Sequence, residues 1–124
     1  KIVISDRFTD STIAYQGFGH GFDIPIIRQI EKLTLNDFAP DITFLLDLSV
    51  DAGLSRSLKQ KNVATGRENT EDRFEKLDTN FHEKLRQGFL TLARENPSRI
   101  HVVDATQDVD SVFQSIKAQV IHAL

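Results

Sequence analysis

The chain of 124 residues contains no cysteine and no methionine. Without cysteine it forms neither a disulfide framework nor a thiolate metal site, which fits a cytoplasmic protein. No apolar run approaches the roughly 20 residues that a membrane-spanning helix needs, and no signal peptide is visible. The net charge of −3 argues against a general nucleic-acid or membrane surface. We therefore expect neither nucleic acid nor a membrane as a partner.

The first residues have the character of a strand interior. Ile2-Val3-Ile4 follows directly after Lys1, without an initiating methionine. Because natural proteins rarely start inside a core element, we expect this sequence to be the C-terminal part of a longer protein. Its 124 residues are still enough for one domain with a hydrophobic core.

Three short apolar runs predict strands: Ile2 to Ile4, Ile42 to Leu48 and Ile100 to Val103. Continuous runs of this kind are typical of strands that are covered on both faces, as in parallel sheets. Segments with helical spacing separate them. Alternating strands and helices indicate βαβ units, and we therefore predict an α/β fold with a parallel sheet of three strands flanked by helices.

Helix signals lie between and after these runs. Asp23 is a suitable N-cap, with Pro25 in the first turn, for a helix that ends before Pro40. A second helix is predicted from Val50 to about Gln60. Two further helices are predicted from apolar stripes. One spans Thr70 to Glu95, with Phe74, Leu77, Phe81, Leu85, Phe89 and Leu92 in its stripe; the other spans Asp108 to His122, with Val109, Val112, Phe113, Ile116 and Val120 on its buried face.

The segment from Lys59 to Asn69 has no clear periodicity. A loop of about a dozen residues in a compact domain is usually a lid, a binding loop or a disordered segment. This one carries Lys59, Lys61 and Arg67, and Arg73 follows shortly after. The residues alone leave these three alternatives open.

Two charged residues, Asp6 and Arg7, follow the first apolar run. In open α/β sheets, ligands bind at the carboxyl ends of the strands. A guanidinium group matches a pair of phosphate oxygens, and a neighbouring carboxylate can hold a magnesium-bound water. Two residues are a weak motif, however, and capping of the next helix or pairing at the surface would also explain them.

Ser11, Tyr15 and Gln16 add to this hypothesis. Ser11 and Tyr15 share a face if the segment is helical. An amide can bind the edge of a base, and a tyrosine ring can pack against a sugar. The alternative is that Tyr15 is a half-buried core residue and Gln16 is solvated.

The segment "DRFTDSTIAYQG" as a whole resembles the D-R-Y/F/H-x-x-S-x-x-A-Y-Q signature of thymidylate kinases, the P-loop enzymes that phosphorylate dTMP. Three later segments also resemble this family in the same order: "NDFAPDITFLLDLSVDAGLSR" from Asn36, "EDRFE" from Glu71 and "HVVDAT" ending at Thr106. The resemblance covers nearly all of the chain. It implies that residues 1–124 are the C-terminal part of a single thymidylate kinase domain, with a P-loop nucleotide kinase fold.

The resemblance also implies roles for individual residues. Arg7 would bind the phosphate of dTMP, and Asp6 would lie near Mg²⁺ and the reacting phosphates. Ser11, Tyr15 and Gln16 would line the thymidine pocket, where Tyr15 would favour deoxyribose by excluding a 2′-hydroxyl. Residues 59–72 would form a lid, and Arg67 in this lid and Arg73 just after it would close over ATP and contribute to catalysis. Arg56 would lie near the adenine. A homodimer is a further implication, and the helix before Pro40 could supply its apolar face.

The phosphate-binding loop of the family, G-x-x-x-x-G-K-S/T, does not occur in these 124 residues. We therefore expect this chain alone to bind ATP poorly and to be inactive in phosphoryl transfer. Two alternatives remain open at this point. The chain could belong to a related P-loop kinase for another deoxynucleotide or deoxynucleoside, or it could be a non-catalytic dimerisation or interaction module.

Overall fold

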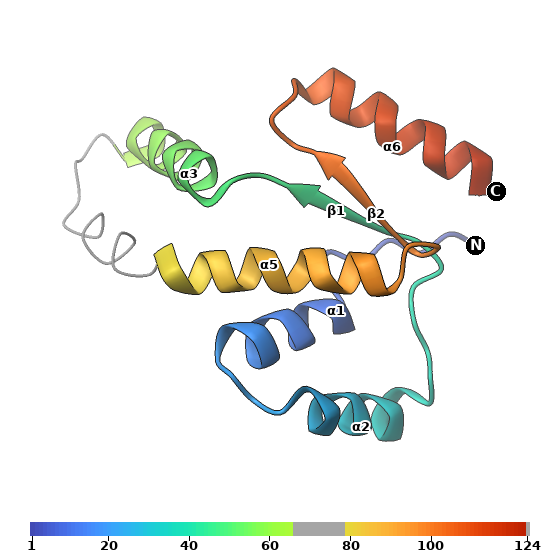
Figure 1. Ribbon diagram of the computed structural model, residues 1–124. Helices are drawn as coiled ribbons and strands as arrows, with labels where there is room; N and C mark the ends of the chain where they lie inside the picture. The colour runs from blue at the N-terminus through green and yellow to red at the C-terminus, as the bar shows by residue number, and fades with distance from the viewer. Residues whose placement is uncertain (66–78, 124) are drawn as a thin grey trace. The chain divides into compact units, whose positions relative to one another are not determined.

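The computed structural model describes residues 1–65 and 79–123, and Figure 1 shows their helices and strands in chain order. The chain divides into two compact units. The first consists of Lys1–Leu45 and Lys84–Val102, and the second of Leu46–Glu83 and Val103–Leu124.

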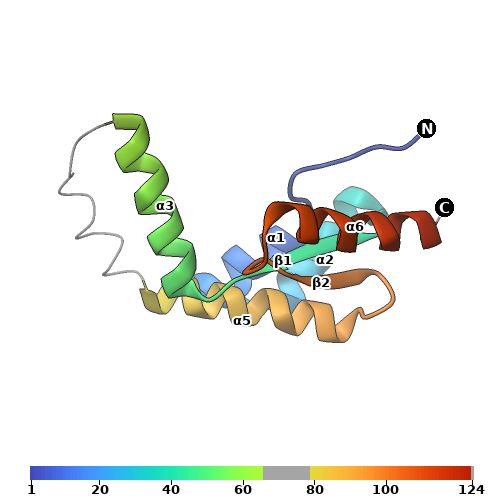
Figure 2. The same cartoon turned by 90° about the horizontal axis from the view of Figure 1, so that it is seen from above.

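Strands β1 (Thr43–Asp47) and β2 (Ile100–Asp104) form a two-stranded sheet, and they lie side by side in Figures 1 and 2. At one end, the amide of Thr43 donates to the carbonyl of Arg99 at 2.8 Å; at the other, the amide of Ala105 donates to the carbonyl of Asp47 at 2.9 Å. Both strands therefore run in the same direction, and the helices between them in the chain belong to the long crossover that a parallel pair needs. The predicted α/β fold with a parallel sheet is confirmed.

The third predicted strand, Ile2 to Ile4, is wrong. These residues have no regular secondary structure and are exposed, Ile4 to 92%. A strand forms only where its backbone groups pair with a neighbouring strand. Within the described residues the sheet contains β1 and β2 alone. Strand-forming side chains at positions 2–4 were therefore not sufficient to form a strand.

The first unit begins with the short helix α1 (Thr9–Thr12), which continues into the π-helix η1 (Ile13–Gly19). The wider turn is visible in its bonding, because the amide of His20 donates to the carbonyl of Tyr15 at 2.9 Å, five residues back. Ile13, Ala14 and Gly17 are the buried residues of this segment. Short π-helical stretches are rare overall, but those that occur often lie at functional sites.

Helix α2 (Ile24–Leu35) begins and ends as the sequence predicts. The Asp23 side chain accepts a hydrogen bond from the amide of Ile26 at 3.1 Å, and a proline lies in the first turn. The helix ends where Asn36 adopts a left-handed conformation with φ of 49°, a common way to satisfy the last carbonyl groups.

Helix α5 (Thr79–Glu95) supplies much of the core of the first unit through the buried Leu85 and Leu92. Gly88 on this helix faces Phe18, and a Cβ atom at position 88 would lie 2.6 Å from Cγ of that ring. The close approach of the two segments therefore requires glycine. Of the predicted helix from Thr70, residues 70–78 with Phe74 and Leu77 lie outside the described residues.

The second unit contains α3 (Val50–Thr65) and α6 (Val109–Ala123). Helix α3 continues five residues beyond the predicted end at Gln60, so residues 59–65 are helical and not the predicted loop. Lysine, glutamine and alanine, which occur in this stretch, have high helix propensity. The rest of the predicted lid, residues 66–72, lies outside the described residues.

Asp108 caps α6, which begins one residue after the predicted start. Its carboxylate accepts hydrogen bonds from the amide of Ser111 at 3.0 Å and from the Ser111 hydroxyl at 2.6 Å. The predicted buried face of α6 is wrong for Val109 and Phe113, which are both exposed. Helical spacing predicts which residues share a face, but burial also requires an element that covers that face.

Candidate functional site

Asp6 and Arg7 lie at the surface just before α1. Arg7 has a φ of 66°, in the left-handed region that non-glycine residues seldom occupy. The hydroxyl of Ser5 donates to the Arg7 carbonyl at 2.9 Å, which helps to hold this conformation. Backbone strain of this kind is frequent at functional sites. The geometry is therefore consistent with the prediction that Arg7 belongs to such a site.

The structure brings Arg7 and Tyr15 together. Cζ of Arg7 lies 5.3 Å from the centroid of the Tyr15 ring, within the range of a cation–π interaction. The exposed guanidinium still has donors for an anionic ligand. A planar cation therefore lies beside an aromatic ring, an arrangement that suits a ligand with a phosphate and a flat or sugar-like body.

Tyr15 is half-buried, and its ring also packs against Phe89 on α5. The two rings are 6.4 Å apart at an interplanar angle of 81°, which is the favourable edge-to-face arrangement. The sequence predicted Phe89 only as a member of an apolar stripe. Its contact with Tyr15 makes it a further site residue, and stripe spacing alone could not have shown this.

Ser11 lies half-buried on α1, and Gln16 lies exposed on the π-helix η1. Both belong to the continuous helical segment that carries Tyr15. The change from α to π geometry after Thr12 alters the angle between successive side chains. Ser11 and Tyr15 are four residues apart, but their side chains are therefore not related by the geometry of a regular α-helix.

Arg56 belongs to the second unit. It is exposed on α3, and its Nη2 atom donates to the carbonyl of Ala105 at 3.2 Å. This bond ties the helix to the residue that follows β2. Arg67 and Arg73, the predicted lid arginines, lie outside the described residues.

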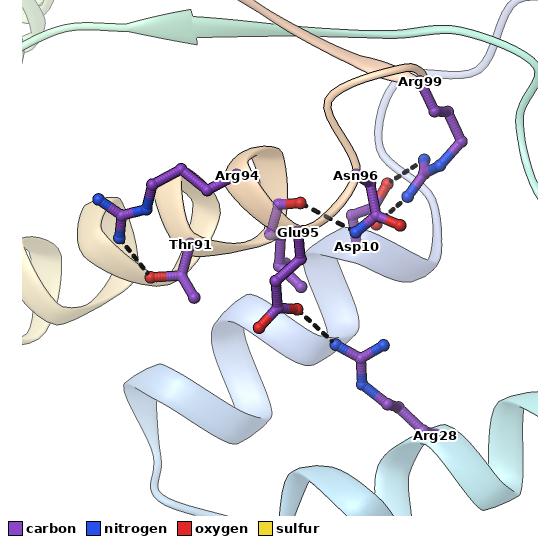
Figure 3. A network of polar contacts seen from close by, with 8 residues as sticks. Asp10, Arg28, Thr91, Arg94, Glu95, Asn96 and Arg99 are labelled. Carbon is purple, nitrogen blue, oxygen red and sulfur yellow. Dashed lines mark hydrogen bonds and ion pairs between the residues drawn. The ribbon is translucent and has the colours of Figure 1, made fainter.

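A polar network surrounds the segment after Arg7 (Figure 3). Asp10 on α1 accepts two hydrogen bonds from Arg99, at 2.7 and 2.8 Å. Nη1 of Arg99 also donates to the hydroxyl of Thr43 at 3.1 Å. The hydrogen bond with Asp10 raises the pKa of Arg99. Neither Asp10 nor Arg99 stood out in the sequence, because 89 residues separate them.

A second ion pair joins α2 and α5 in the same unit, also drawn in Figure 3. Nη2 of Arg28 lies 2.9 Å from Oε2 of Glu95, and both side chains are about half exposed, 50% and 51%. Glu31, also on α2, has a carboxylate oxygen that is buried and that has no hydrogen-bond partner among the residues which the structure describes. Burial, followed by the nearby charge of Asp10, raises the pKa of Glu31.

No group of three or more metal-ligating side chains occurs within residues 1–65 and 79–123. The predicted magnesium residue, Asp6, has an exposed carboxylate. This fits Mg²⁺, which is usually held by one or two carboxylates together with water and substrate phosphates. In the same part of the chain, none of the helices combines the length and apolar character that crossing a bilayer requires.

The family model described as thymidylate kinase matches residues 1–116. This chain belongs to the thymidylate kinase family. It is 42% identical over 124 residues to a thymidylate kinase of Maridesulfovibrio salexigens and 43% identical over 124 residues to one of Syntrophotalea carbinolica. In both cases all of this chain is aligned, and it covers 57% and 56% of those proteins. The chain thus spans little more than half the length of these relatives.

Structural similarity gives the same family. The crystal structure of thymidylate kinase from Ehrlichia chaffeensis matches with a TM-score of 0.59 and 32% sequence identity. The match covers 92% of this chain and 46% of that protein. The predicted membership of the thymidylate kinase family is confirmed, and every candidate site residue lies within the matched range 1–116.

Proposed function

We propose that the intact protein transfers the γ-phosphoryl group of ATP to dTMP, giving dTDP and ADP for the synthesis of dTTP. Membership of the thymidylate kinase family supports the reaction. The contact between Arg7 and Tyr15 is the observation in this chain that supports the acceptor, because it combines a phosphate-binding cation with a ring that can pack against a nucleoside.

In this proposal each site residue has a defined task. The guanidinium of Arg7 holds the dTMP phosphate in line with the γ-phosphate of ATP. Tyr15 packs against the deoxyribose, and Ser11 and Gln16 line the pocket for the base. Positioning and charge neutralisation supply most of the catalysis in phosphoryl transfer, so these contacts have a direct effect on rate.

An oxygen of the dTMP phosphate attacks the γ-phosphorus of ATP, and the bond from that phosphorus to the bridging oxygen of ADP breaks. Asp6 would help to hold Mg²⁺, which when bound neutralises charge on the phosphates. Arg67 and Arg73 would add positive charge from the lid, and Arg56 would lie near the adenine. Binding of ATP also needs a phosphate-binding loop, which these 124 residues do not include.

The proposed reaction is tested with the intact protein, ATP and Mg²⁺. We expect dTDP to form from dTMP and not from thymidine, with other deoxynucleoside monophosphates as weaker competitors. Arg7→Ala should abolish most of the activity. Preference for another monophosphate or for a nucleoside would instead support a related deoxynucleotide or deoxynucleoside kinase. Unchanged nucleotide binding in Arg7→Ala would support a non-catalytic interaction module.

We also propose that the protein is a homodimer in the cytoplasm. Helix α2 presents Ile26, Ile30 and Leu33 to solvent, each more than half exposed. These residues are four and three positions apart and therefore share one helix face, which a second copy could cover. Leu33→Glu should give a monomer in sedimentation experiments, whereas Gln29→Glu, a change at an exposed polar residue of the same helix, should leave the dimer intact. An intact protein that is monomeric without any substitution would refute this proposal.

A further inference from the structure

The ion pairs Asp10–Arg99 and Arg28–Glu95 each connect segments of the first unit, and they differ in their surroundings. Asp10 and Arg99 are paired through two hydrogen bonds, with side chains only 13% and 20% exposed. Arg28 and Glu95 are joined by a single hydrogen bond between side chains that are half exposed. The geometry of the first pair is specific, because a guanidinium that donates twice to one carboxylate fixes both distance and orientation.

Stability alone is a weak explanation for the enclosed pair. The cost of removing two charges from water can equal or exceed their attraction, so pairs of this kind often add little net free energy. An enclosed ion pair can instead fix the position of two segments relative to each other. The third bond from Arg99, to the hydroxyl of Thr43, strengthens this point because it fixes the guanidinium from the side of the sheet as well.

Helix α1 needs an external anchor. It consists of Thr9–Thr12 and is the first turn of the continuous helical segment that ends at Gly19. The side chain of its N-cap residue, Phe8, makes no capping hydrogen bond. The first turn of a helix is held less firmly when its free amides have no capping side chain. Arg99 supplies the anchor, since its backbone carbonyl is bound to the first residue of β1 and its side chain is bound to Asp10.

The anchored residue lies within the proposed nucleotide site. Asp10 comes three residues after Arg7 and directly before Ser11. The left-handed backbone at Arg7 connects the preceding segment to α1, so the start of α1 determines where the guanidinium of Arg7 can reach. Tyr15 follows in the continuous helical segment, and its ring packs against Phe89.

We infer that the Asp10–Arg99 pair is a positioning element that holds the segment carrying Arg7 and Tyr15 in the geometry that binds the nucleotide phosphate. This inference rests on the proposed function. Asp10 and Arg99 act through Arg7 and are positioning residues, with no contact to the reacting atoms assigned to them. The pair thus makes a residue next to β2 part of the acceptor site.

The test measures KM for dTMP, KM for ATP, kcat and thermal stability in the intact protein. Arg99→Gln and Asp10→Asn should each raise KM for dTMP by about tenfold to a hundredfold, as expected when a binding group is displaced by about 1 Å. KM for ATP should change less than about twofold, and Arg99→Lys, which keeps the charge but not the paired donors, should have an intermediate effect. Arg28→Gln, which breaks the exposed pair, is the matched control and should leave KM for dTMP unchanged.

A double-mutant cycle with Arg7 separates positioning from a merely structural effect. If the pair acts through Arg7, adding Arg99→Gln to Arg7→Ala should raise KM for dTMP by less than about twofold, although it still lowers the melting temperature. Equal fold-changes in both backgrounds, or a result for Arg99→Gln that matches Arg28→Gln, would overturn the inference and leave the proposed function intact. If Arg7→Ala itself does not alter dTMP binding, the proposed function fails and the inference fails with it.

Discussion

The guanidinium of Arg7 lies 5.3 Å from the centre of the Tyr15 ring. An interaction of this type at an exposed site contributes about 0.5–1 kcal/mol, which is enough to favour one orientation of a long side chain. We therefore propose that Tyr15 orients the Arg7 side chain for the ligand as well as packing against the ligand. Phe89 in turn fixes the ring of Tyr15. Changes at any of these three residues should affect the proposed acceptor site.

Arg7→Lys should raise KM for dTMP by about tenfold to a hundredfold, equivalent to losing about 1.5–3 kcal/mol from a hydrogen bond to a charged group. Lysine keeps the charge but cannot donate two parallel hydrogen bonds to a phosphate. Steady-state kinetics in the intact protein measure the effect, with Arg28→Lys as the control for changing an exposed arginine. An unchanged KM would show that Arg7 acts only as a point charge.

Tyr15→Leu should weaken the discrimination between deoxyribose and ribose. The proposed packing of the ring against the sugar leaves no room for a 2′-hydroxyl, and a smaller side chain would relieve that clash. We expect the ratio of kcat/KM for dTMP to that for ribothymidine monophosphate to fall by about tenfold. Tyr15→Phe keeps the ring and should keep the ratio. If the ratio stays constant in Tyr15→Leu, Tyr15 does not contribute to the discrimination between deoxyribose and ribose.

Glu31→Gln should stabilise the protein at neutral pH. The pKa of Glu31 is raised, chiefly by burial, so the folded state binds a proton more readily than the unfolded state does. Ionised Glu31 therefore lowers stability above its folded pKa, and this penalty is relieved as the pH falls toward the ordinary glutamate range. The variant should be more stable than the parent at pH 7, and this difference should shrink on acidification.

Thermal unfolding tests this prediction when the Glu31→Gln variant and the unsubstituted protein are compared between about pH 7 and pH 5. Asp41→Asn removes an exposed carboxylate from the same unit and should show no such gain. A Glu31→Gln variant that is less stable than the parent at pH 7 would mean that the carboxylate has a stabilising partner.

Gly88→Ala should destabilise the protein by about 1–3 kcal/mol, as overpacking of a core does. The added methyl group would lie 2.6 Å from Cγ and 2.7 Å from Cβ of Phe18, so the π-helix and α5 would have to separate. Because the same helices hold Tyr15 and Phe89, KM for dTMP should rise as well. Denaturant unfolding and kinetics measure the two effects.

Gly53→Ala is the matched control for Gly88→Ala. It lies within helix α3, and its nearest contact would be Cδ2 of Leu48 at an ordinary 3.7 Å. Alanine has the higher helix propensity, so this variant should gain about 0.5–1 kcal/mol. Opposite signs for the two substitutions are expected, and equal losses would contradict the packing argument.

Local signals in the sequence predicted much of the fold. Asp23 and the proline in the first turn set the start of α2, and Asp108 set the start of α6, because caps act within a few residues. The apolar runs at β1 and β2 were correctly assigned to a parallel sheet. Sequence similarity also identified the family and, through it, Arg7 and Tyr15, which the structure places in contact.

Features that depend on distant residues were not predictable. Ile2 to Ile4 has the side chains of a strand but forms none here, because pairing depends on a neighbouring strand. The Asp10–Arg99 pair and the contact of Tyr15 with Phe89 join residues far apart in the chain. The π-helix has no side-chain signature of its own, and the sequence indicated only that the segment could be helical.

The π-helix at Ile13–Gly19 has an evolutionary consequence. One surplus residue in a helical turn is what a single-codon insertion into an ordinary helix would create, and deleting one codon would restore the ordinary winding. The helix itself could survive such a deletion, but every side chain after it would be rotated by about 100° about the axis. Tyr15 and Gln16 would then face in new directions, so mutations that change the length of this segment should be far less accessible to natural variation than substitutions within it.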